Sequence, residues 1–124
     1  MMEKGLSAQS KVTVDGGNVA ATMGSGDLQV FATPAMVALM ENAAMKAVAD
    51  HLPEGSTTVG AEMNVTHIKP SSVGAEIVAS AVLTEVEGRK LTFNVGAHDA
   101  EGMIGEGVHV RYVVDREKFM SKVR

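Results

Sequence analysis

The sequence has 124 residues, 45% of them apolar, which is typical of one globular domain. It contains no cysteine, which excludes disulfides, thiolate catalysis and cysteine-based zinc sites. The formal net charge of -4, without a lysine or arginine block, argues against a nucleic-acid-binding protein. No apolar run approaches the roughly 18 residues of a membrane span, and the N-terminal segment lacks the apolar stretch of a signal peptide. We therefore expect a single cytoplasmic domain over residues 1–124 that does not enter a membrane.

A strand and a loop are predicted before the one long helix. Residues 11–14 favour a short strand, and residues 15–27, rich in Gly, Ser and Ala, favour a loop. Thr33 and Pro34 then open the helix, because Thr is a good N-cap and Pro fits the first helical position. Residues 35–50 are apolar over most of the helix circumference, so the helix should be largely buried. Proline and glycine within residues 52–55 end it.

The rest of the chain alternates apolar and polar residues, which is typical of strands. Four strands are predicted, at residues 57–68, 75–86, 90–98 and 108–114. We expect hairpin connections, such as Glu87-Gly88, to make them an antiparallel meander. One apolar helix must then pack on the sheet, which predicts an α+β fold. A sheet of about five strands curled around one long central helix is the layout of a hotdog fold.

Glu41 is a carboxylate on the apolar stripe of the predicted helix. Its neighbours at helical spacing, such as Val37, Ala44 and Val48, are apolar. A buried carboxylate is costly unless it is paired or protonated, and burial would raise its pKa toward the range useful for acid–base chemistry. The alternative is a Glu at the edge of the stripe that reaches water. Both interpretations of Glu41 remain open from these residues alone.

His67 and Thr33 are two further polar candidates. His67 follows Met63 and Val65 on one strand face, and its side chain suits proton transfer near neutral pH, although a structural role is the commoner one. Thr33 has a simple role as an N-cap. The same helix start also presents free N–H groups that could stabilise an oxyanion.

The other three histidines give weaker indications of a functional role. His51 lies near the helix end, His98 precedes a turn, and His109 lies on the last strand, opposite the apolar set. No pair of histidines has helical metal-ligand spacing, so no metal site is expected. The sequence also lacks a G-x-S-x-G nucleophile motif and a phosphate-binding loop.

Several short blocks together resemble the fluoroacetyl-CoA thioesterase family. They cover about three-quarters of the chain, from Val30 to the C-terminus. The blocks are VFAT at 30–33, MVALME at 36–41, VG at 59–60, VTH at 65–67, EGR at 87–89, AHD at 97–99, IGEG at 104–107 and EKF at 117–119. The resemblance implies a hotdog dimer that hydrolyses a short acyl-CoA, with no cofactor beyond the CoA of the substrate.

The resemblance also assigns roles to residues. The family's catalytic Thr, Glu and His fall on Thr33, Glu41 and His67. Its glycine that helps to hold the substrate carbonyl falls on Gly60. We expect Gly60, Phe31 and Pro34 to bind substrate.

One region departs from the family pattern. The fluoroacetyl specialist carries an aromatic-rich lid before its helix, but this chain has no aromatic residue before Phe31. A general short-chain acyl-CoA thioesterase is therefore the prediction, acting as a homodimer or a higher oligomer.

Two rival functions remain. An enoyl-CoA hydratase would need a close Asp–His pair, for which Asp50-His51 is the candidate. A non-catalytic protein that binds acyl-CoA or another small ligand is the other.

Overall fold

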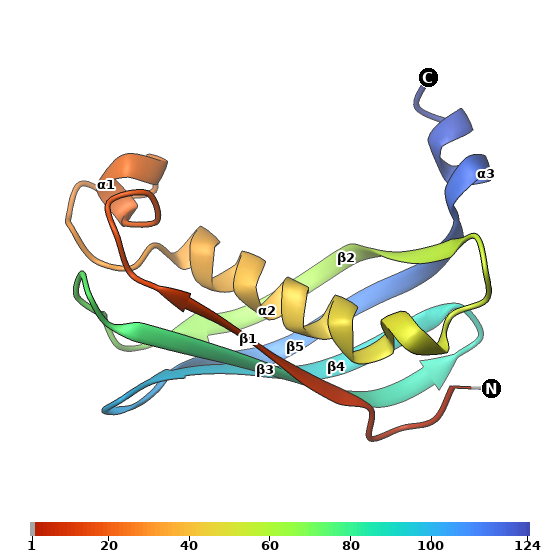
Figure 1. The fold of residues 1–124 in the computed structure, drawn as a ribbon, viewed down its shortest axis with the longest axis horizontal. Coiled ribbons are helices and arrows are strands. Elements are labelled where there is room, and N and C mark those ends of the chain that lie inside the picture. Colours follow the sequence, from red (N-terminus) through yellow and green to blue (C-terminus); the bar gives the residue numbers. More distant parts are fainter. Residues whose placement is uncertain (1) are drawn as a thin grey trace.

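The computed structural model describes residues 2–124. Figure 1 shows a long helix, α2, lying along one face of a curved five-stranded sheet. In chain order the elements are β1 (Ser7–Thr13), α1 (Ala20–Met23), α2 (Thr33–Val48), the 3-10 turn η1 (Ala49–His51), β2 (Ser56–His67), β3 (Glu76–Glu87), β4 (Lys90–Asp99), β5 (Gly102–Asp115) and α3 (Arg116–Ser121). This is the α+β hotdog arrangement that the sequence predicts.

The strand order differs from the predicted meander. The sheet has the order β1-β3-β4-β5-β2, with antiparallel pairing between neighbours. Only β3, β4 and β5 follow one another as hairpins, whereas β2 pairs with β5 at the edge of the sheet. Residues 68–75, which join β2 to β3, are too many for a tight hairpin. The alternation of apolar residues marks a strand but does not identify its partner, so the prediction of four meandering strands was wrong.

The core lies between α2 and the middle of the sheet. The apolar faces predicted for β3 and β4 are confirmed, since each of their residues is buried: Ile77, Ala79, Ala81, Leu83, Leu91, Phe93, Val95 and Ala97. From α2 the buried residues are Met36, Met40, Ala43, Ala44, Ala47 and Val48. Each fully buried large apolar side chain contributes about 1.5–3 kcal/mol. The sheet and the helix therefore hold each other in place.

The two ends of the chain contain more structure than the sequence predicts. β1 begins at Ser7 rather than residue 11, because residues 7–13 pair with β3, and its Ser10 hydroxyl donates to Asn42 of α2 at 2.6 Å. The predicted loop over residues 15–27 contains the short helix α1. At the C-terminus, α3 was not predicted; the Asp115 carboxylate caps it by accepting the Lys118 N–H at 3.0 Å.

A different short helix lies near each end of α2. In Figure 1, α1 lies beside the start of α2, and α3 projects from the sheet near the far end of α2. None of the helices within residues 2–124 is both long enough and apolar enough to cross a membrane.

Candidate active site

Thr33 and His67 meet where α2 begins and β2 ends. The Thr33 hydroxyl lies 2.8 Å from His67 Nδ1. The N-cap of α2 is Ala32 and not Thr33, so the predicted capping role was wrong. Thr33 and Pro34 are instead the first two helical residues, where a proline costs nothing because the first N–H groups have no intrahelical acceptor. The Thr33 side chain is thereby free to bond to His67.

His67 has one ring nitrogen bonded and one free. Its Nε2 is the one buried side-chain nitrogen or oxygen of residues 2–124 that lacks a hydrogen-bond partner. The Phe31 ring packs edge-on against the imidazole, with centroids 6.5 Å apart. Burial lowers the pKa of His67, and the nearby Lys69 backbone offsets part of that shift. The structure therefore holds a neutral imidazole with an unused nitrogen.

A cleft of about 280 Å³ opens beside this pair. Its lining residues are Ala20, Ser25, Val30, Phe31, Thr33, His67, Ile68, Lys69 and Pro70. Phe31, a predicted substrate-binding residue, is one of them. Pro34, another, is exposed and does not line this cleft. No aromatic residue other than Phe31 lines it, as expected for a chain without the aromatic lid.

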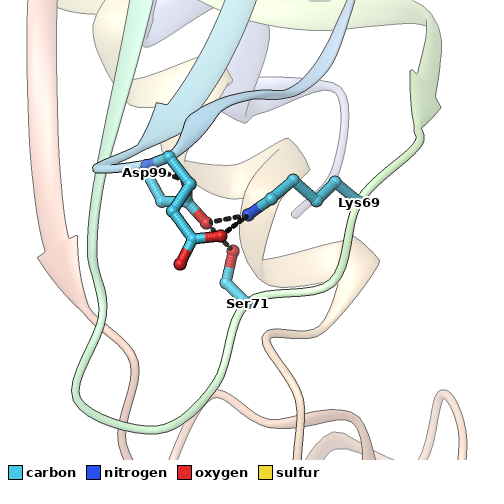
Figure 2. A network of polar contacts seen from close by, with 4 residues as sticks. Lys69, Ser71 and Asp99 are labelled. Atoms are coloured by element: carbon cyan, nitrogen blue, oxygen red, sulfur yellow. Dashed lines mark hydrogen bonds and ion pairs between the residues drawn. The ribbon is translucent and has the colours of Figure 1, made fainter.

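The loop after His67 is held by a polar network (Figure 2). Lys69 Nζ lies 2.7 Å from the Asp99 carboxylate, and the Ser71 hydroxyl donates to the same oxygen at 2.9 Å. The Glu101 N–H donates to the other Asp99 oxygen at 2.8 Å. The Lys69 side chain lowers the pKa of Asp99 to about 2, so this carboxylate stays charged. The network fixes one wall of the cleft.

Glu41 lies beside a different strand pair, away from this cleft. Its Oε2 is 3.9 Å from Nη1 of Arg111, an ion pair without a hydrogen bond. The Arg111 side chain is 7% exposed and that of Glu41 is 41% exposed. Glu41 therefore lies at the edge of the apolar stripe. Its side chain reaches water, as in the second of the two interpretations that the sequence left open. Its carboxylate oxygens remain free to accept hydrogen bonds.

Gly60 makes the space that the Glu41 carboxylate occupies. A Cβ atom at residue 60 would lie 2.6 Å from Glu41 Oε2 and 3.3 Å from the ring of His109. The register of β2 on β5 also shifts between Gly60 and Glu62, which opens the strand locally. Gly60 thus lies against a predicted catalytic carboxylate, which gives a physical reason for glycine there.

His109 and Arg111 are residues that the sequence did not reveal. His109 was expected opposite the apolar set, but it is 1% exposed and stacks on Phe93. Arg111 donates from Nε to the Thr58 hydroxyl at 2.9 Å, and from Nη1 to His109 Nε2 at 3.2 Å. Arginine has no acceptor, so His109 carries its proton on Nδ1 and donates to the Glu62 carbonyl at 2.7 Å. The only signal was the H-x-R spacing, which places both on one strand face.

The chain thus presents two half-sites. The helix-start half comprises Thr33 and His67, and the strand half comprises Glu41, Gly60 and Arg111. Thr33 and Glu41 belong to the same continuous α2, which excludes a non-helical segment between them. Eight residues of α-helix separate side chains by about 12 Å along the axis and about 80° around it. The structure does not bring Thr33 into contact with Glu41 within the chain.

Asp50 and His51, the pair considered for a hydratase, lie elsewhere. Both are exposed in η1, at the end of α2 opposite Thr33. This position gives them no contact with either half-site.

Comparisons with known proteins identify the family of the chain. The model of the fluoroacetyl-CoA-specific thioesterase family matches residues 14–117. A fluoroacetyl-CoA thioesterase of Streptantibioticus cattleyicolor is 44% identical over 96 residues, 77% of this chain and 69% of that protein. A solved structure of the fluoroacetyl-CoA thioesterase FlK superposes with a TM-score of 0.93 at 35% identity, covering 100% of this chain and 96% of that one.

A more distant structure shares the fold alone. It is a thioesterase superfamily member of Thermus thermophilus with a TM-score of 0.92 at 24% identity, covering 100% of this chain and 92% of that one. The family model and the curated relative carry the assignment, and the half-sites lie within the matched residues. The chain belongs to the fluoroacetyl-CoA-specific thioesterase family and is a thioester hydrolase.

Proposed function

We propose that the protein hydrolyses short-chain acyl-CoA to a free acid and CoA, with Thr33, Glu41 and His67 as its catalytic residues and without a cofactor. The observation that carries this proposal is the 2.8 Å contact of Thr33 with His67 at the start of α2. It places a proton-transfer group beside backbone N–H groups of a helix start, and such groups stabilise the oxyanion that forms when a thioester is attacked. The relatives named above act on an acyl-CoA thioester, which supports the same reaction here.

The bond to Thr33 determines which ring nitrogen of His67 carries the proton. When the Thr33 hydroxyl donates to Nδ1, the proton of the neutral imidazole is on Nε2, which is buried without a partner. Water adds to the thioester carbonyl, the C–S bond breaks, and Nε2–H of His67 protonates the departing thiolate, while Nδ1 takes the Thr33 hydroxyl proton and a proton of the added water replaces it on Thr33. Thr33 orients the ring and the incoming water.

Glu41 promotes attack on the thioester carbonyl in one of two ways. As a base it removes a proton from water; as a nucleophile it forms a mixed anhydride that water then cleaves. Hydrolysis in ¹⁸O-labelled water separates the two routes, because only an anhydride opened at the Glu41 carbonyl leaves label in the protein. Single-turnover reactions followed by mass spectrometry of the peptide that contains Glu41 would detect it.

A homodimer brings the two half-sites together in this proposal. β2 is an edge strand, and Gly60, Ala61 and Glu62 on it are exposed. A long exposed edge favours pairing with another strand, and a twofold axis between Met63 and Asn64 would join two antiparallel copies of β2 with Gly60 opposite His67. The His67 end of one β2 then meets the Gly60 half of the other. Thr33 and His67 of one protomer would face Glu41 and Gly60 of its partner.

A thiol-release assay over a panel of acyl-CoAs, fluoroacetyl-CoA included, tests the proposed function. We expect saturable release with short acyl groups. Binding of acyl-CoA without thiol release would instead identify a non-catalytic binding protein. The cytoplasmic location expected from the composition stays a prediction.

A further inference from the structure

His109 is a buried histidine that the reaction proposed above does not use. It lies on β5 with 1% of its surface exposed, and its ring stacks on Phe93 with centroids 6.2 Å apart. Burial lowers the pKa of His109, and a hydrogen bond to the Glu62 backbone offsets part of that shift, so the ring is neutral. A neutral imidazole has one donor and one acceptor, and in this ring both have a protein partner. His109 is therefore held in one orientation.

The Nδ1 side of the His109 ring binds the irregular stretch of β2. Its N–H donates to the Glu62 carbonyl at 2.7 Å, directly after the register shift between Gly60 and Glu62. An irregularity of this kind bends a strand. A Cβ atom at residue 60 would lie 3.3 Å from Cε1 of His109, so the ring also lies against Gly60. His109 thus fixes the stretch of β2 that borders the Glu41 carboxylate.

The Nε2 side of the ring binds Arg111, which is 6% exposed. Thr58 accepts hydrogen bonds from Nε at 2.9 Å and from Nη2 at 3.0 Å, and His109 accepts one from Nη1 at 3.2 Å. Nη1 of a guanidinium has two N–H groups, so one of them is not used in this bond. Glu41 is the one carboxylate that pairs with Arg111 among residues 2–124, and its Oε2 is 3.9 Å from the same Nη1. Arg111 therefore faces Glu41 with an unused donor.

The 3.9 Å separation matters for the chemistry assigned to Glu41. It is short enough for the two charges to attract each other but too long for a hydrogen bond. An arginine that moved closer would bind the carboxylate through N–H donors and occupy the lone pairs that the reaction needs. Thr58 and His109 oppose this movement, because they hold three of the N–H groups of the guanidinium.

We propose that His109 is a positioning residue of the thioester reaction. By accepting one Nη1 N–H and fixing β2 beside Gly60, it keeps Arg111 close enough to attract the Glu41 carboxylate but not close enough to bind it. The carboxylate then stays in place with its lone pairs free for water or for the thioester carbonyl. This role rests on the proposed function, which takes Glu41 as the group that promotes attack.

Two substitutions at residue 109 test the bond to Arg111 by kinetics. The side chain of His109→Asn is too short to reach the position of Nε2, whereas the amide oxygen of His109→Gln can take that position as an acceptor. We expect His109→Asn to lower kcat about tenfold at unchanged KM, because Arg111 then binds Glu41. His109→Gln should regain most of this loss.

Val48→Ala is the control for lost packing in these assays. Val48 is fully buried about two helical turns beyond Glu41 and belongs to neither half-site. We expect this variant to melt at a lower temperature at unchanged kcat. Undiminished kcat in His109→Asn would overturn the role of His109, as would a folded His109→Gln protein that is as slow as His109→Asn.

Nitrogen-15 NMR of the side chains tests the geometry without turnover. We expect the proton of His109 on Nδ1, and only small shifts of the Arg111 guanidinium signals when Glu41→Gln is introduced into the wild type. In His109→Asn the same Glu41→Gln change should shift these signals more, because the released Nη1 donor had bound Glu41. Equal shifts in the two proteins, or a proton on Nε2 of His109, would contradict the proposed restraint of Arg111.

The two measurements separate the role of His109 from the proposed function. Wild-type protein that releases no thiol from any acyl-CoA would contradict the proposed function, and NMR alone would then decide whether His109 restrains Arg111. Thioester hydrolysis at the wild-type rate by His109→Asn would contradict only the role of His109.

Discussion

The Thr33 hydroxyl lies 2.8 Å from Nδ1 of His67, joining the first residue of α2 to the last residue of β2. This contact leaves Nε2 of His67 as a buried nitrogen without a partner among residues 2–124. A buried polar atom without a partner is costly, and a hydrogen bond with bound substrate is the partner that we propose for it.

Replacement of His67 by Ala should lower kcat by roughly 100-fold, the usual scale for a proton-transfer residue. His98→Ala is the control, because His98 is exposed on β4 and belongs to neither half-site. Thiol release measures both variants, and circular dichroism checks their folds. Equal turnover by His67→Ala and the wild type would assign His67 a structural role.

The activity should have an acidic limb set by His67. Burial lowers the pKa of His67 below the usual histidine value of 6.5, so the ring stays neutral to a lower pH than an exposed histidine. A step that needs neutral His67 is then retained at pH 6.5 and is lost only as the pH falls through the lowered pKa. The pH profile of kcat/KM measures this limb, and a midpoint above 6.5 would disagree with the prediction.

Gly60→Ala should lower kcat by about 100-fold, because the new Cβ would lie 2.6 Å from Glu41 Oε2 and displace the carboxylate. The fold should survive, since the displaced atom is the far end of a flexible side chain. Gly96→Ala on β4 is the matched control: its Cβ would have no neighbour closer than 3.8 Å. Turnover numbers and thermal melting compare the two, and undiminished kcat in Gly60→Ala would show that the Glu41 position is not critical.

Asp99→Asn should destabilise the protein at neutral pH but not in acid. The folded state lowers the pKa of Asp99 from 3.8 to about 2, so the charged carboxylate adds stability above pH 3.8 and loses it as the pH falls toward 2. The melting temperature of Asp99→Asn should therefore approach that of the wild type as the pH is lowered from neutral to about 3. Asp27→Asn, at an exposed residue outside the network, is the control. A melting-temperature difference between Asp99→Asn and the wild type that does not change with pH would contradict a charged Asp99.

The sequence predicted what depends on local patterns. Alternation located the buried faces of β3 and β4, and the apolar run located α2, because these periods follow directly from the geometry of strands and helices. Pairing of β2 with β5 is a contact between distant segments, and alternation carries no information about it. The same limit hid the burial of Arg111, since its partners Thr58 and Glu41 lie far away in sequence.

Within the candidate site, chemistry singled out Glu41, His67 and Thr33 before any partner was known. Each is a polar or charged residue among apolar neighbours or at a helix start. The bond between Thr33 and His67 and the fit of Glu41 over Gly60 required the fold. Their catalytic roles remain predictions.

Subunit exchange tests most directly whether one thioesterase site is built from two chains. Thr33→Ala and Glu41→Gln proteins, each inactive alone, are mixed in equal amounts under conditions that allow exchange. Half of the dimers are then heterodimers with one intact site of two, so about a quarter of wild-type activity should return. Thiol release measures the recovery, and native mass spectrometry confirms the exchange. Confirmed heterodimers that remain inactive would contradict a site shared between Thr33 of one protomer and Glu41 of its partner.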